Sequence, residues 1–198
     1  MMNIQPVYLQ GQVVRLEPLA LSHIPDLAIA GKDESIWQFM LYGSVTSLDK
    51  MTEFVKKLLE LQAKGTDLPF TVIHLESNRP IGMTRYMDIQ RGNRGLEIGG
   101  TWYATAYHRT RVNTECKYLL LRHAFEQLDA IRVQLKTDLR NESSQRAIER
   151  LGAVKEGVLR DHMILPDGIV RSSVYYSILL REWPGVKSRL QALMSREG

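Results

Sequence analysis

The chain has 198 residues, 44% of them hydrophobic and 24% charged, with a formal net charge of +4 and a sequence pI of about 9.2. These values predict one globular domain over residues 1–198, with a core large enough to fold without stabilising cross-links. The single cysteine, Cys116, excludes an intrachain disulfide, and no apolar run is long enough to span a bilayer. Since MMNIQPVYLQ has no features of a secretory signal, we expect a cytoplasmic protein without a membrane partner.

The positive charge suits an anionic ligand or a nucleic-acid surface. The charges are scattered, however, and no block of five or more Lys or Arg residues occurs, so nucleic-acid binding is disfavoured. The sequence has no HExxH segment, no CxxC pair and no histidines at metal-ligand spacing. It also lacks the lysine-containing phosphate loop of nucleotide triphosphatases. We therefore expect neither a metal site nor nucleotide hydrolysis.

The first half of the chain predicts a strand, two helices and an antiparallel meander. A strand at Val13–Pro18 precedes a helix within Leu19–Gly31, with Ser22 as its N-cap. A longer helix begins at a Ser47 cap and ends at Gly65. Three strands joined by short polar turns follow, at 70–76, 81–89 and 94–103.

In the second half, helices and strands alternate. A helix from about Asn113 to Leu128 leads to a strand at Ala130–Leu139. A second helix begins at an Asn141 cap and ends at Gly152, and a long hairpin and a short helix after Pro184 follow. This order predicts an α/β (α+β) domain with one central, mixed, mostly antiparallel twisted sheet flanked by helices.

The segment YHRTRVNTEC joins a predicted strand to a predicted helix without any glycine. The first amides of a helix are unpaired and carry the positive end of the macrodipole, so they attract phosphate. Arg109 and Arg111 add charge and bidentate donors. A solvated turn whose arginines pair with local carboxylates would have the same sequence, so both interpretations stay open at this point.

The helix NESSQRAIERLG places a hydroxyl on its apolar face. Ser144, Ala147, Ile148 and Leu151 follow the i, i+3, i+4, i+7 spacing of one helix face. The hydroxyl of Ser144 therefore either bonds back to the carbonyl of Arg140 or faces a ligand that lies against the helix.

Three strings carry a family resemblance: VVRLEPLALSHIPDL, LEIGGTWYATAYHRTRVNTECKYLLLRHAFE and RVQLKTDLRNESSQRAIERLGAVKEGVLR. With the hairpin that follows, they cover nearly the whole chain. On these strings the chain resembles the GNAT acetyltransferase superfamily, in particular its RimJ/RimL-type branch of ribosomal-protein N-terminal acetyltransferases. The resemblance implies a single GNAT-like domain that binds acetyl-CoA between two splayed middle strands, EIGGTWY and RVQLKTDL.

The same resemblance implies which residues contact acetyl-CoA. The pyrophosphate would lie on the turn from His108 to Asn113, where His108, Arg111 and Asn113 all depart from the family's pattern. If the first glycine position needs a positive φ, Arg111 there costs about 1 kcal/mol. A main-chain amide near Trp102 would hold the oxyanion, and Asn141 the pantetheine arm. The expected set is Trp102, Tyr103, His108, Arg109, Thr110, Arg111, Val112, Asn113, Thr114, Asn141 and Ser144.

Acetyl transfer to an amine needs a proton acceptor, a donor for the oxyanion and a proton for the thiolate. The resemblance implies direct transfer within a ternary complex, and Ser144 is the candidate donor to the sulfur. Glu97 is the candidate base, since it shares a strand face with Gly99 and Thr101. A structural role for Glu97, paired with an arginine such as Arg85, is the alternative. The other base candidates are His108, His123 and Tyr176.

The acceptor is expected to enter opposite the CoA turn. Trp37, Phe39 and Tyr42 in WQFMLYG are the candidate acceptor-binding residues, together with the hairpin segment LRDHMILPDGIVRSS. These aromatic residues could equally be core. The resemblance allows a protein N-terminus, an amino sugar, a polyamine or a small drug amine as acceptor, and it is compatible with a homodimer.

Two other functions stay open. One is a non-catalytic module that senses acyl-CoA or docks on ribosomal RNA, which the glycine-free turn and the basic charge favour. The other is transfer from a different CoA thioester such as succinyl-CoA, whose extra carboxylate Arg109 or Arg111 would bind.

Overall fold

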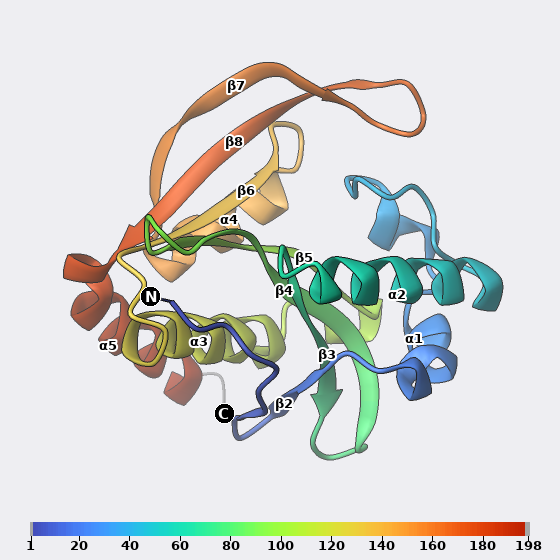
Figure 1. The fold of residues 1–198 in the computed structure, drawn as a ribbon, viewed down its shortest axis with the longest axis horizontal. Coiled ribbons are helices and arrows are strands. Elements are labelled where there is room, and N and C mark those ends of the chain that lie inside the picture. Colours follow the sequence, from blue (N-terminus) through green and yellow to red (C-terminus); the bar gives the residue numbers. More distant parts are fainter. Residues whose placement is uncertain (1, 197–198) are drawn as a thin grey trace.

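The computed structural model describes residues 2–196 of the chain. They form one eight-stranded sheet in the order β1-β2-β3-β4-β5-β6-β8-β7 (Figure 1). Every neighbouring pair is antiparallel except β5 and β6, which run parallel. The strands are β1 (Leu9–Gln10), β2 (Val14–Pro18), β3 (Leu68–His74), β4 (Arg79–Gln90), β5 (Gly95–Tyr103), β6 (Arg132–Asp138), β7 (Val154–Ile164) and β8 (Val170–Leu179).

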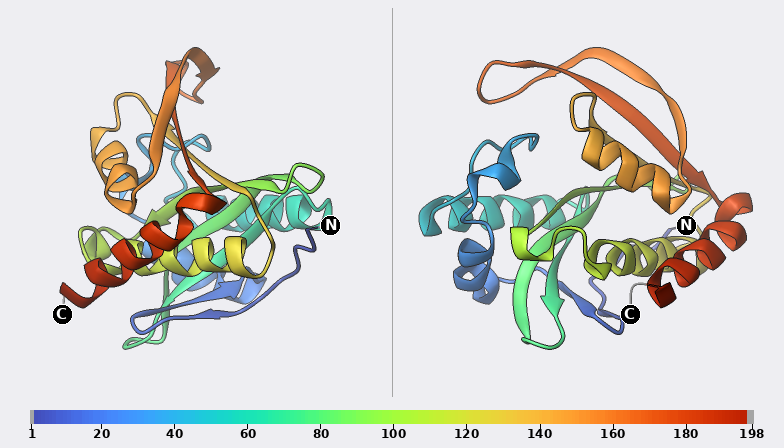
Figure 2. Two further views of the ribbon diagram at one scale, coloured as in Figure 1. Left: turned by 90° about the vertical axis from the view of Figure 1, so that its left-hand side faces the viewer. Right: turned by 180° about the vertical axis from the view of Figure 1, so that it is seen from behind.

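Helices connect the two halves of the sheet and cover parts of both faces (Figures 1 and 2). Two precede β3, one joins β5 to β6, one joins β6 to β7 and one follows β8. They are α1 (Ile24–Ala30), α2 (Leu48–Ala63), α3 (Arg111–Glu126), α4 (Glu142–Leu151) and α5 (Trp183–Arg196), with short 3-10 turns at η1 (Leu21–His23), η2 (Glu34–Trp37), η3 (Thr105–Tyr107) and η4 (Leu180–Glu182). Over residues 2–196, no helix has the length and apolar character needed to cross a membrane.

The predicted fold class and order of elements are confirmed, and most predicted caps are too. The side chain of Ser47 accepts from the amide of Lys50 at 3.2 Å and begins α2, and Gly65 follows that helix with φ of 72°. The prediction for Ser22 is wrong. That residue lies inside η1, and α1 starts only at Ile24.

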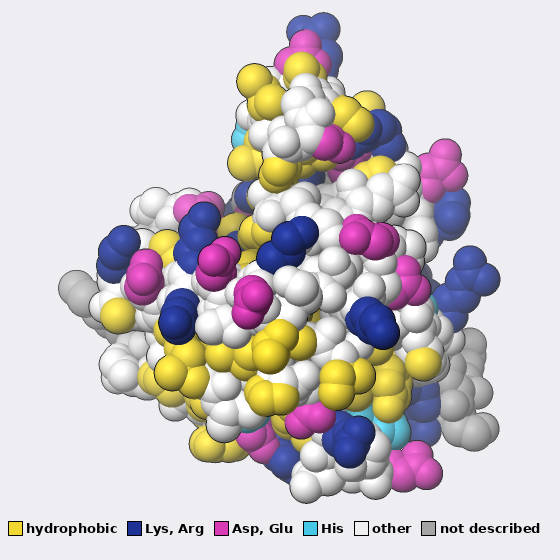
Figure 3. Space-filling model, turned by 90° about the vertical axis from the view of Figure 1, so that its right-hand side faces the viewer, with side chains coloured by type: hydrophobic (Ala, Val, Ile, Leu, Met, Phe, Trp, Pro, Cys, Tyr) yellow, Lys and Arg dark blue, Asp and Glu magenta, His cyan; other side chains and the backbone are white. Residues whose placement is uncertain are grey.

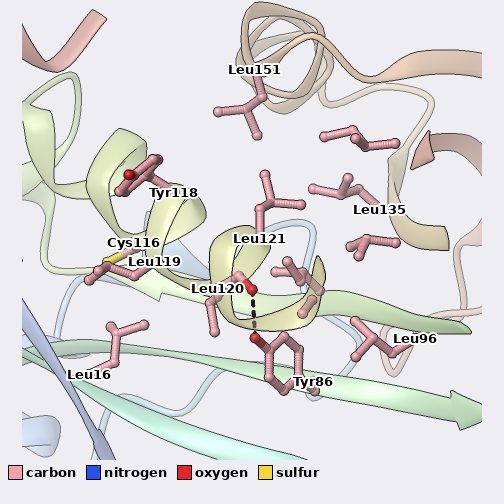
Figure 4. Packing of buried hydrophobic residues seen from close by; sticks show 14 of the residues in the cluster. Leu16, Tyr86, Leu96, Cys116, Tyr118, Leu119, Leu120, Leu121, Leu135 and Leu151 are labelled. Carbon is pink, nitrogen blue, oxygen red and sulfur yellow. Dashed lines mark hydrogen bonds between the residues drawn. The ribbon is translucent and has the colours of Figure 1, made fainter. Parts of the chain in front are cut away.

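Two hydrophobic cores lie on opposite faces of the sheet. The larger one packs α3, α4 and α5 against the sheet and contains Tyr103, whereas the smaller one packs α1 and α2 and contains Trp102. Adjacent strand residues point to opposite faces, so this pair fixes which side each helix covers. In the larger core, the hydroxyl of Tyr86 donates to the carbonyl of Leu120 at 2.7 Å (Figure 4).

The parallel strands β5 and β6 pair over only three residues each. Gly95, Leu96 and Glu97 lie opposite Arg132, Val133 and Gln134, and the pairing then ends although both strands continue. From Ile98 to Tyr103, the β6-facing edge of β5 therefore has no strand partner. The widening gap between the two strands, here called the wedge, is the predicted splay (Figure 1).

Candidate functional site

The floor of the wedge contains an irregularity at Gly100. The β4–β5 register shifts between Met83 and Arg85, and Gly100 has φ of 57°, which favours glycine. A Cβ at Gly100 would lie 2.9 Å from both Arg85 Nε and the hydroxyl of Tyr42. Both the backbone angle and the lack of space therefore require glycine here, next to the free edge of β5.

The helix that follows β5 begins at Arg111, two residues earlier than predicted. Thr110 is the N-cap of α3, and its hydroxyl accepts from the amide of Val112 at 3.3 Å. Asn113, where the helix was expected to begin, does not cap it, because its side chain accepts from the hydroxyl of Tyr103 at 3.2 Å. The start of α3 still presents the amides of Arg111 and Asn113, which have no intrahelical partner.

The positive φ in this turn falls on Arg109 and not on Arg111. Arg109 has φ of 60°, while Arg111 is the first helical residue. The expected penalty for the missing glycine at Arg111 therefore does not arise. The ring of His108 is tied to the end of β5 by a 2.9 Å hydrogen bond between Nε2 and the carbonyl of Tyr103.

The side chain of Arg111 lies on the β2 side of α3. It lines two surface hollows, of about 480 Å³ and about 440 Å³, and its Nε is buried without a hydrogen-bond partner in the part of the chain that the structure describes. Val13 and His74 line the first hollow, and Gln12 lines the second. Thr114 is fully buried, and its hydroxyl accepts from Arg150 Nη2 at 2.8 Å. Thr114 therefore fastens α3 to α4.

The other side of the wedge is the start of α4, as predicted. Asn141 Oδ1 accepts from the amide of Ser144 at 3.0 Å, and Gly152 ends the helix with φ of 102°. Both predicted caps are confirmed. Within residues 2–196, neither Asn141 Nδ2 nor the hydroxyl of Ser144 makes a hydrogen bond. The back-bond from Ser144 to the carbonyl of Arg140 is therefore absent, and both groups are free for a ligand.

The carboxylate of Glu97 lies on the face opposite α3 and is only 1% exposed. Its Oε2 accepts from Lys136 Nζ at 3.0 Å and from Gln134 Nε2 at 2.9 Å, and its Oε1 makes no hydrogen bond with the described residues. The alternative pairing of Glu97 with Arg85 is not formed, because that guanidinium contacts Asp67 Oδ2 at 3.3 Å. The partner of Glu97 is an ammonium on the neighbouring strand.

Four polar residues that the sequence analysis did not single out continue this face across the sheet, although two of them lie in the hairpin segment expected to bind the acceptor. Lys136 on β6 lies opposite Tyr175 on β8, with its ammonium 5.9 Å from the ring centre. The rings of Tyr175 and His162 are in edge contact at 5.7 Å. Arg171 lies on the same face of β8, and burial lowers the pKa of the His162 ring, as do Lys136 and Arg171. Alternation along β6, with Val133 and Leu135 in the core, was the signal that could have found Lys136.

The expected acceptor wall is assembled from two distant segments. Arg171 Nη1 donates to the carbonyl of Phe39 at 3.3 Å, so the β7–β8 hairpin and the loop after η2 are in contact. The hydroxyl of Tyr42 accepts from Arg85 Nη2 at 3.0 Å. Trp37, in contrast, is 3% exposed and packs against Trp102 at 5.0 Å, so its side chain supports this wall from behind. The hairpin projects above this side of the molecule (Figure 3).

The remaining base candidates are packing residues. Burial and Arg122 lower the pKa of His123 to about 4, and its ring stacks on Tyr86. Burial raises the pKa of Tyr176 to about 12, and its hydroxyl donates to Glu149 at 3.0 Å. Burial also raises the pKa of Cys116 to about 12, so its thiol is inert. The described residues contain no cluster of His, Cys, Asp and Glu suited to a metal ion.

Comparison with known proteins decides the family. Residues 14–154 match the model of the acetyltransferase (GNAT) domain. The chain belongs to the GNAT acetyltransferase family. A GCN5-related N-acetyltransferase from Brucella melitensis is 27% identical, with a TM-score of 0.90 over 96% of this chain and 86% of that one. The predicted GNAT fold is confirmed, and the protein is classed with the acetyl-CoA-dependent N-acetyltransferases.

Two of the proteins that the chain resembles carry names of the RimJ/RimL-type branch. "Putative ribosomal N-acetyltransferase YdaF" of Bacillus subtilis is 36% identical over 106 residues, which span 54% of this chain and 57% of YdaF. The fold also matches Mycobacterium smegmatis RimJ in complex with CoA-disulfide. That likeness has 20% identity and a TM-score of 0.79, and covers 96% of this chain and 93% of RimJ.

Proposed function

We propose that this GNAT protein transfers an acetyl group from acetyl-CoA to a primary amine by direct attack within a ternary complex. The wedge is the observation that carries the proposal. β5 keeps a free backbone edge beyond Glu97, and free polar groups of Asn141 and Ser144 lie on α4 at the other side. The complex of RimJ with CoA-disulfide supports a CoA ligand for this fold.

The residues of the wedge fit the parts of acetyl-CoA in turn. The unpaired amides at the start of α3 would hold the pyrophosphate, and Asn141 Nδ2 would donate to the pantetheine arm. A free amide of β5 near Trp102 would donate to the oxyanion that forms when the amine attacks. Acetyl-CoA supplies the thioester carbonyl carbon that the amine attacks.

The transfer requires two proton movements. The amine nitrogen bonds to the carbonyl carbon, and the carbon–sulfur bond breaks. Glu97 Oε1 would accept the proton of the amine, directly or through water, because it is the free oxygen of that carboxylate. The hydroxyl of Ser144 would pass a proton to the departing thiolate and would regain one from solvent water. Phe39 and Tyr42, with the β7–β8 hairpin, would enclose the acceptor.

Calorimetry with acetyl-CoA and a free-thiol assay across an amine panel test this function together. We expect binding of acetyl-CoA and release of CoA thiol with at least one amine, with product mass identifying the transferred acyl group. A parallel series with succinyl-CoA tests the donor. Absence of binding at millimolar acetyl-CoA would refute the proposal, whereas binding without turnover would favour an acyl-CoA sensor.

Docking on RNA is less well supported by the surface. On the side that carries α1, α2 and the hairpin tip, Lys and Arg are interspersed with Asp and Glu (Figure 3). Nucleic-acid sites gather one sign of charge, and their affinity falls steeply with salt. The glycine-free turn no longer favours a non-catalytic role, because Arg111 is helical and does not need the backbone angle of a glycine.

A further inference from the structure

Arg171 is a buried cation that has no ionic partner in the described part of the chain. Its side chain lies on β8 and the residue is 4% exposed. Arg171 Nε donates to Ser173 Oγ at 3.1 Å and Nη1 to the carbonyl of Phe39 at 3.3 Å, both neutral acceptors. Among residues 2–196, Nη2 has no hydrogen-bond partner and no carboxylate forms an ion pair with this guanidinium. A buried charge is costly unless it is paired, so this arrangement calls for an anion.

The nearest carboxylates are already engaged. Both oxygens of Asp138 accept from Arg140, Oδ1 from Nε at 2.9 Å and Oδ2 from Nη2 at 2.6 Å. Glu97 Oε2 accepts from Lys136. Asp138 and Glu97 raise the pKa of Arg171, but burial outweighs them and lowers it. The positive charge of Arg171 is therefore only partly balanced within the protein.

Arg171 lies between the two walls of the proposed acceptor site. It belongs to the β7–β8 hairpin, and its contact with Phe39 reaches the opposite wall. Four residues further along β8, on the same face, Tyr175 lies opposite Lys136, which donates to Glu97. The guanidinium is thus on the same face of the sheet as the proposed base, away from α3 and the CoA turn.

We propose that Arg171 binds a carboxylate carried by the acceptor, so that the amine substrate of this acetyltransferase is also a carboxylic acid, such as an amino acid or a peptide. This inference rests on the proposed function. A guanidinium matches a carboxylate in shape and charge. A monoanion is also favoured over a phosphate dianion, because Glu97 and Asp138 lie on the same face and would repel a second negative charge.

Pairs of amines that differ only in the anion test the proposal. The panel holds amino carboxylic acids of increasing chain length and, for each, the carboxamide. We expect the wild-type protein to acetylate the best acid with a kcat/KM about tenfold or more above that of its amide, mainly through KM. In Arg171→Met this preference disappears, because the amides react as before and the acids slow to the same level. Arg171→Lys keeps part of the preference, since it keeps the charge.

Two controls keep the result interpretable. Arg181→Met removes an exposed arginine on η4, just beyond β8, and should leave the ratio of acid to amide unchanged. Calorimetry with acetyl-CoA reports whether each variant is folded. If Arg171→Met does not fold, the ratio in Arg171→Lys and in the wild-type protein decides. Equal rates for acids and amides in the wild-type protein, or an equal loss on both in Arg171→Met, would overturn the inference.

Failure of the proposed function would look different. In that case the wild-type protein releases CoA with no amine of the panel. Calorimetric titration of the same acids and amides then decides the inference without turnover. Binding of an acid that its amide does not reproduce, and that Arg171→Met loses, supports a carboxylate site at Arg171. Equal binding of acids and amides contradicts it.

Discussion

Lys136 Nζ lies 3.0 Å from Glu97 Oε2, immediately beyond the point where β5 and β6 stop pairing. The contact bridges the two strands where their backbones no longer do so. It occupies one oxygen of the carboxylate and leaves Oε1 free on the face where the acceptor is proposed to bind. The ion pair therefore sets the position of the candidate base.

Replacement of Glu97 by Gln should lower kcat by about 100-fold, because the amide keeps the shape of the side chain but cannot accept a proton. The KM for acetyl-CoA should change little, since Glu97 faces away from α3. Steady-state kinetics with the best amine of the panel measure both. The matched variant is His162→Asn, which removes the imidazole on the same face of the sheet. If it loses activity and Glu97→Gln does not, His162 is the base.

The order of elements could be predicted because each signal is local. Asn141 and Gly152 mark the two ends of α4 by their own chemistry, and the structure confirms both. The predicted start of α3 was wrong for a non-local reason. Thr110 and Asn113 are both good cap residues, and the choice depends on the hydroxyl of Tyr103, which holds Asn113.

The polar face could be predicted only in part. Glu97 was found from the alternation of β5, but its partner depends on which strand lies beside β5. The sheet order β5-β6-β8-β7 brings Lys136 next to Glu97 and places Arg171 and His162 beyond it. Sequence spacing does not contain that order, so a charged residue on β4, Arg85, was the wrong choice of partner.

The two polar groups of Asn141 allow its cap to be separated from its proposed ligand role. Asn141→Asp keeps the oxygen that accepts from the amide of Ser144 but removes the amide donor. We expect unchanged stability and a several-fold higher KM for acetyl-CoA. Asn141→Ala loses both and should also lower the free energy of unfolding by about 1 kcal/mol. Urea denaturation and calorimetry measure the two effects. An unaltered KM in Asn141→Asp would contradict contact with the pantetheine arm.

Glycine substitutions in the turn test whether backbone amides hold the phosphate. Arg109→Gly removes a side chain from a left-handed backbone position and should raise the free energy of unfolding by up to about 1 kcal/mol. Arg111→Gly should leave the Kd for acetyl-CoA within about threefold, because this guanidinium lies towards β2 and outside the wedge. Calorimetry measures the Kd. A tenfold higher Kd for acetyl-CoA in Arg111→Gly, about 1.4 kcal/mol, would show that the guanidinium binds the phosphate.

Lys117 gives a prediction on stability. Its residue is 6% exposed, one turn before Leu121 on α3, and its Nζ donates to the hydroxyl of Thr101 at 2.6 Å. Burial lowers the pKa of Lys117 from 10.5 to about 8. Between these two pH values the unfolded chain binds the proton that the folded protein has released, so the free energy of unfolding rises with pH.

We therefore expect the difference in unfolding free energy between the wild-type protein and Lys117→Met to shift by about 3 kcal/mol in favour of the wild type between pH 7 and about pH 10. Urea denaturation at a series of pH values measures it. Burial raises the pKa of the Cys116 thiol to about 12. Above the ordinary pKa of a cysteine, this thiol therefore makes the free energy of unfolding fall with pH and opposes the effect of Lys117. It is present in both proteins, so its effect largely cancels in the difference. If the difference in unfolding free energy between the two proteins does not change with pH, Lys117 keeps its proton in the folded protein, where the hydroxyl of Thr101 accepts from it.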